Sequence, residues 1–230
     1  MKIEKDLERY LLEKNIYIAQ EYFKGQNYKS KEDIIKHLKL ISKFQSILSR
    51  FNGRKYGRVF CNYGKEVEKI KSSIIILDYL KIEETKKLNE ILKNIDKNLD
   101  EIDIKSLIKR SIAKNEMNIG RVDEKNLRVV DEIEIGKIKK VSYGLIEEEI
   151  IDYLRKVKKN LNEEEIEEVT KIYVDQVNLT EESLKYIKEM TLAPFEVIRY
   201  INKYRSNLNK RRLIELINME CKKEALWDEL

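Results

Sequence analysis

The sequence predicts a mainly α-helical protein with one small β-hairpin at about residues 117–131. Helices are expected because apolar residues follow helical spacing over most of the chain, and because its 230 residues include seven glycines and one proline. The hairpin is expected in MNIGRVDEKNLRVVDEIEI, which breaks this pattern. Two short runs typical of β-strands, Ile119–Val122 and Leu127–Asp131, flank a polar turn at residues 123–126.

The composition indicates a folded domain with a nearly balanced charge. Hydrophobic residues make up 42% of the chain and charged residues 39%. This apolar share can build a core, so we expect no disorder. Lys and Arg number 47 against 42 Asp and Glu, and the net charge is +5. A dedicated nucleic-acid binder concentrates its positive charge, so protein partners are favoured over nucleic acid. Without a long linker or a repeat, residues 1–230 are interpreted as a single helical domain.

Cysteine, histidine and apolar runs exclude several classes of site. Cys61 and Cys221 form no CxxC pair, so neither a disulfide framework nor a zinc site is expected. The one histidine, His37, lies within a helical pattern, and we expect it at the surface or half-buried. The first residues are charged throughout, unlike a signal peptide, and the apolar run Ile74–Leu77 is too short to span a bilayer. A cytoplasmic protein is expected.

The first half of the chain shows capped, periodic helices. Within residues 3–23 leucines share helical spacing, and the run Ile16–Ile18 fits a strand or the end of that helix. Ser30 and Asp33 have the spacing of an N-cap and its acidic N3 residue. The helix behind them has an apolar face made of Ile34, Leu38, Ile41, Phe44, Ile47 and Leu48.

The remaining helices follow from the same periodicity. We expect them within residues 64–82, 83–113, 145–158, 163–176, 181–191, 194–205 and 209–226. Asn162 and Thr180 are good N-caps, and Pro194 suits a first helical position. The acidic run at 163–168 is expected to complement a helix dipole, with no role as a metal cluster. The C-terminal helix within residues 206–230 either docks a partner or closes the core.

A basic, aromatic loop lies between the first two long helices. It contains Arg54, Lys55, Tyr56 and Arg58. Positive charge and stacking suit phosphate or RNA. A solvated loop is the simpler interpretation, and a helical nucleic-acid-associated protein is the weakest of the function hypotheses.

An Asn and an Asp lie at the two ends of the predicted hairpin: Asn118 is followed thirteen positions later by Asp131, after two valines. With this spacing, residues 20–205 resemble the C-terminal lobe of aminoglycoside/choline-kinase-like phosphotransferases. In that lobe a catalytic loop supplies an Asn, and a short hairpin ends in a metal-binding Asp. The resemblance implies a vestigial Mg²⁺ and nucleotide site at these two residues. As ordinary turn and strand-end residues they would bind nothing.

Two further segments resemble the spore-coat CotS-like family of Firmicutes. They are Tyr63–Lys65, before a charged helix, and Leu192–Tyr200, which contains the family's spaced Pro and Tyr. The Lys-, Ile- and Asn-rich composition suits an AT-rich genome of that group. The resemblance implies a role in the spore coat, with coat proteins or a second copy of the chain as partners.

The departures from the phosphotransferase pattern predict that the chain is no enzyme. The position of the catalytic Asp holds Ala113, and that of the motif His holds Ser111. About 20 residues precede the helical lobe, too few for a nucleotide-binding lobe. Loss of the base alone removes about 10²–10⁴ in rate. We therefore expect a pseudokinase remnant that acts by protein–protein binding; the alternative is a module that senses Mg²⁺-nucleotide through Asn118 and Asp131.

Overall fold

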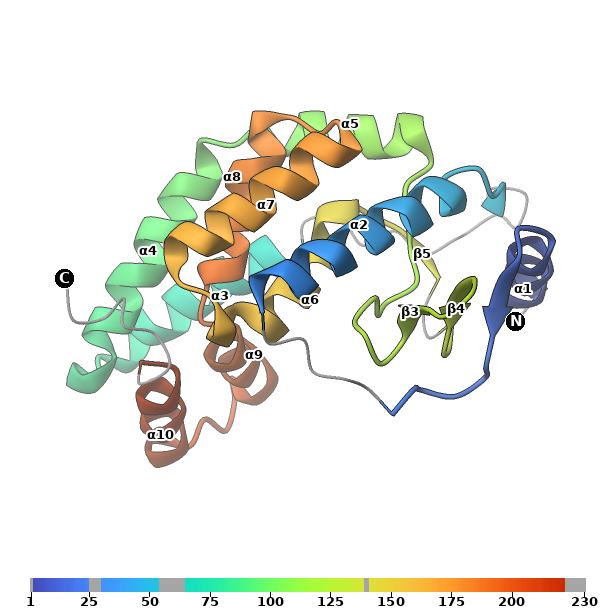
Figure 1. Ribbon diagram of the computed structural model, residues 1–230. Helices are drawn as coiled ribbons and strands as arrows, with labels where there is room; N and C mark the ends of the chain where they lie inside the picture. The colour runs from blue at the N-terminus through green and yellow to red at the C-terminus, as the bar shows by residue number, and fades with distance from the viewer. Residues whose placement is uncertain (1, 25–29, 54–64, 139–140, 222–230) are drawn as a thin grey trace. The chain divides into compact units, whose positions relative to one another are not determined.

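The computed structural model describes residues 2–24, 30–53, 65–138 and 141–221 (Figure 1). Within these residues it contains ten α-helices and a few short strands, and 69% of the described residues are helical. The prediction of a mainly α-helical fold is confirmed. The chain divides into two compact units, of which the first comprises Met1–Tyr63 and Asp103–Thr191 and the second Gly64–Ile102 and Leu192–Leu230. The expectation of a single domain stays a prediction.

The first unit holds both small sheets. Its helices are α1 (Lys2–Glu13), α2 (Lys31–Leu48), α5 (Ile104–Lys114), α6 (Ile146–Val157), η3 (Lys158–Asn160), α7 (Glu163–Val177) and α8 (Glu181–Leu192). Its strands are β1 (Ile16–Ile18), β2 (Met117–Asn118), β3 (Leu127–Val129), β4 (Ile133–Ile135) and β5 (Ser142–Tyr143). The run at 16–18 is thus a strand.

Helix α2 forms the centre of the first unit, as its periodicity predicts. It begins where the Oγ atom of Ser30 accepts a hydrogen bond from the amide of Asp33 over 3.2 Å. Five residues of its apolar face, Ile34, Leu38, Ile41, Phe44 and Leu48, are fully buried, and Ile47 is half-buried. Helix α7 lies alongside it in Figure 1 and packs against it.

The strand pairing differs from the predicted hairpin. Strand β3 forms a hairpin with β4, in which Leu127 faces Ile135, and β1 adds to β4 in parallel. Strand β2 pairs instead with β5, and the run Ile119–Val122 is no strand. The predicted pairing within 117–131 is therefore wrong, and the hairpin lies at 127–135. The physical reason is that the amides of residues 119 and 120 bond to a side chain from α6, as described below.

The second unit contains only helices and their connections among its described residues. It consists of α3 (Lys65–Leu80), η2 (Glu83–Thr85), α4 (Lys86–Asp100), α9 (Phe195–Tyr204) and α10 (Lys210–Cys221). Asn202 joins α9 to α3, because its Nδ2 atom donates to the carbonyl of Lys69 over 3.0 Å and to the Oγ atom of Ser73 over 2.9 Å. Helix α10 packs on α9 with Leu213 and Ile217 buried, which favours closure of the core over docking of a partner.

A capping box fixes the start of α7. Asn162 accepts a hydrogen bond from the amide of Glu165 over 2.8 Å, and the carboxyl of Glu165 accepts one from the amide of Asn162 over 2.9 Å. We expect Asn162→Ala to lower the free energy of unfolding by about 1 kcal/mol, because an orphan amide loses its partner. Glu164→Ala, an exposed change in the same turn, is the control and should stay within about 0.5 kcal/mol. Urea unfolding measures both, and equal losses would contradict the assignment.

Among the helices that the structure describes, none has both the length and the apolar character needed to cross a membrane.

Candidate functional site: the loop between strands β2 and β3

The loop at residues 119–126 leads from one sheet to the other, and a buried carboxyl holds its start. The Oε1 atom of Glu149, from α6, accepts hydrogen bonds from the amides of Ile119 over 2.6 Å and of Gly120 over 3.0 Å. Gly120 has a φ of 83°, a conformation that costs glycine little. The other oxygen, Oε2, makes no hydrogen bond of normal geometry with the described residues. Glu149 thus accepts the hydrogen bonds that a neighbouring strand would otherwise accept from these two amides.

Burial controls the protonation of Glu149. Its side chain is 4% exposed. Burial raises the pKa of Glu149 to about 7. The amides of Gly120 and Ile119 and the side chain of Gln45 favour the charged form and so lower this pKa, but burial outweighs them. The carboxyl also borders a closed cavity of about 10 Å³, room for about one water molecule.

The middle of the loop carries an ion-paired carboxylate. Asp123 is buried, with its Oδ1 atom 2.7 Å from Nε of Arg121 and its Oδ2 atom 2.6 Å from Nζ of Lys156. Burial opposes ionisation, but the hydrogen bonds from Arg121 and Lys156 outweigh it and hold the pKa of Asp123 below its usual value. Lowering its pKa makes the carboxylate a weaker general base.

The end of the loop is tied down by an amide side chain. Nδ2 of Asn126 donates to the carbonyls of Arg121 over 2.7 Å and of Lys137 over 2.9 Å, and its Oδ1 atom accepts from the amide of Lys137 over 2.7 Å. Gly136 leaves room for this contact: a Cβ atom there would lie 2.9 Å from Oδ1 of Asn126 and 2.5 Å from the carbonyl oxygen of Glu21. Both ends of the Asn126 amide are thus bonded to the backbone.

His37 fixes the same loop from α2, and the expectation of a surface or half-buried histidine is wrong. The ring is 2% exposed and its Nε2 atom lies 2.7 Å from the carbonyl oxygen of Val122. It also packs against Tyr153 at 4.9 Å between ring centroids. Burial lowers the pKa of His37, so the neutral ring is favoured. The helical pattern placed His37 beside the apolar face but gave no sign of a partner 85 residues away.

A buried ion cluster supports the strand that precedes the loop. Arg110, from α5, makes two hydrogen bonds to Glu116, at 3.0 and 2.9 Å, and two to Glu147, at 2.6 and 2.8 Å. Ser183 donates to Glu147 over 2.6 Å. The side chains of both acids are at most 4% exposed. One guanidinium therefore holds two buried carboxyls, and the cluster is a structural support.

The predicted binding residues lie apart in the described structure. Asn118 is buried on β2, where its Nδ2 atom donates to the carbonyl of Leu145 over 3.1 Å. Asp131 is exposed in the turn between β3 and β4, which belong to the other sheet. Their binding of Mg²⁺ or nucleotide stays a prediction. Ala113 is exposed in α5, so the stretch at 111–114 is helix. The predicted loop residues Arg54, Lys55, Tyr56 and Arg58 lie outside the described residues.

The described part of the chain contains no group of three or more His, Cys, Asp or Glu side chains placed to hold a metal ion. A scan of the chain against models of protein families finds no match, and a search of curated proteins finds no similar sequence.

Proposed function

We propose that this chain is a catalytically inactive, kinase-like protein that acts by binding other proteins. The observation that supports it is the loop at 119–126, in which the side chains of Asp123 and Asn126 are engaged in holding the loop itself. Asp123 neutralises two cations, and Asn126 bonds to three backbone groups. Phosphoryl transfer needs a base and metal ligands that face substrate. Asp123 and Asn126, occupied by these contacts, supply neither.

The strand pairing suggests a second alignment of the sequence with the kinase catalytic loop, with Asn126 in place of Asn118 as the reference. Kinase catalytic loops follow H-R-D-x-x-x-x-N, with the base five residues before an Asn, and a later D-F-G supplies the metal-binding Asp. In this alignment Asn126, which directly precedes the hairpin β3–β4, corresponds to that Asn. The base position then holds Arg121, and the later triplet of similar type is Ser142-Tyr143-Gly144. In this alignment Arg121 and Ser142 occupy the two positions where an active kinase has carboxylates.

Both alignments leave the position of the catalytic base without a carboxylate. With Asn118 as the reference the base position holds Ala113, and with Asn126 it holds Arg121. Neither side chain accepts a proton from a substrate hydroxyl near neutral pH. The setting that the family resemblance suggests is the spore coat, and absence of the chain from sporulating cells would exclude that setting.

A thermal-shift titration with Mg²⁺ and ATP tests the proposal. A site filled at about 100 times its dissociation constant would stabilise the fold by about 2.7 kcal/mol. For a domain of this size that raises Tm by about 2–4 °C. We expect no shift, in the natural chain or in the Asp131→Ala variant. A shift that Asp131→Ala abolishes would replace the proposal with a nucleotide-sensing function.

A further inference from the structure

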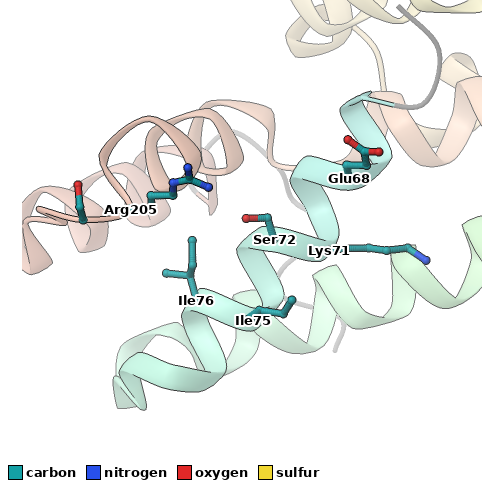
Figure 2. A pocket seen from close by; sticks show the side chains of 7 residues that line it. Glu68, Lys71, Ser72, Ile75, Ile76 and Arg205 are labelled. Atoms are coloured by element: carbon teal, nitrogen blue, oxygen red, sulfur yellow. The ribbon is translucent and has the colours of Figure 1, made fainter.

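The second unit carries an open groove beside an exposed apolar stripe. Helix α3 forms one wall, and the chain just after α9 forms the other (Figure 2). The groove has a volume of about 510 Å³, and its lining residues are Glu68, Lys71, Ser72, Ile75, Ile76, Arg205 and Ser206. Ile75 is 69% exposed, and Tyr79, one turn further along α3, is 85% exposed. These two large side chains leave apolar surface exposed on one face of α3, beside the groove.

The groove has unpaired charges of opposite sign on its two walls. Glu68 lies on the α3 wall, and Arg205 follows α9 on the facing wall (Figure 2). Both are exposed, and neither forms an ion pair with another described residue. Lys71 differs, because it is directed to α4 and pairs with Asp96 and Asp100. The charges available to a partner are therefore one acid and one base.

A surface of this kind is complementary to itself. In a two-fold dimer the same patch faces its own copy, so residue i meets residue j and j meets i. Glu68 of one copy would meet Arg205 of the second, and the reverse contact would follow by symmetry. Ile75 and Tyr79 lie one turn apart on one face of α3, with the small side chain of Ser72 three residues before Ile75, so two copies can pack this face against itself.

We propose that the chain forms a homodimer through this groove, with Glu68 and Arg205 as reciprocal ion pairs around an apolar centre. The inference rests on the proposed binding function and names a second copy of the chain as its partner. One helix face is smaller than the roughly 800 Å² per partner of a standard interface. The dimer is therefore weak and forms with rising concentration.

A charge-reversal pair tests the dimer. Sedimentation equilibrium of the full chain from about 5 to about 500 µM should show monomer passing to dimer. In Glu68→Arg the introduced arginine meets Arg205, and in Arg205→Glu two acids meet, so each variant alone should dimerise at least 10-fold more weakly. An equimolar mixture of the two should dimerise again, because both contacts then join opposite charges.

The control is Glu101→Arg, an exposed reversal in the same unit and outside the groove, which should leave the dissociation constant unchanged. A natural chain that stays monomeric up to about 500 µM would overturn the inference. So would a dimer unaffected by both reversals, or a mixture that does not recover. These outcomes are distinct from failure of the proposed function, which nucleotide binding or turnover would reveal without any change in mass.

Discussion

Arg110→Ala is expected to lower the free energy of unfolding by about 3–5 kcal/mol, the largest loss from any single change considered. The substitution leaves Glu116 and Glu147 buried without their common cation, and burial already raises the pKa of Glu116. Two uncompensated carboxyls inside the first unit must then either take up protons or draw in water. Urea unfolding at pH 7, followed by circular dichroism, measures the loss.

The matched control is Arg128→Ala. Arg128 pairs with Glu134 at 2.6 Å on the sheet, but its side chain is 41% exposed, so solvent screens the pair. This change should cost no more than about 1 kcal/mol. If both variants lost the same free energy, the buried cluster would not be the support described here.

Glu149→Gln is expected to stabilise the protein above pH 7 and to leave it nearly unchanged near pH 5. The folded pKa of Glu149 is about 7, above the usual value of 4.5, so the folded state holds a proton that the unfolded state releases. The contribution of this proton to the free energy of unfolding is complete below about pH 4.5 and is lost as the pH rises through about 7. A pKa shift of this size corresponds to a change of at most about 3 kcal/mol in the free energy of unfolding. Glutamine keeps the oxygen that accepts from Ile119 and Gly120.

The measurement is the difference in unfolding free energy between Glu149→Gln and the natural chain at pH 5, 6, 7 and 8. The difference isolates Glu149 from His37, whose pKa is lowered by burial and whose effect has the opposite sign. Glu132→Gln, an exposed change in the hairpin, should give a flat difference. A flat difference for Glu149→Gln as well would show that this carboxyl is charged throughout.

Local patterns predicted the helices well because the cause of each is local. The cap at Ser30 and the capping box at Asn162 depend on residues three positions away. The apolar face of α2 follows from helical spacing alone. Such short-range rules also gave the correct mainly helical class.

The loop and its supports could not be predicted in the same way, because their partners lie far away in sequence. Arg110 reaches Glu147 across 37 residues, and Glu149 reaches Ile119 across 30. The run Ile119–Val122 has strand composition, but a side chain takes its amides, so the predicted pairing failed. One signal was present: Glu147 and Glu149 both lie three or four positions from buried residues of α6, on its apolar face.

Release of phosphate from ATP in the presence of Mg²⁺ tests most directly the proposal that the chain is a catalytically inactive kinase-like protein. We predict no release above buffer from the natural chain, and the same result for Asp123→Asn, which removes the charge of the loop's one ion-paired carboxylate. Turnover by the natural chain that Asp123→Asn abolishes, while circular dichroism shows the variant folded, would contradict the account and make the loop at 119–126 an active site.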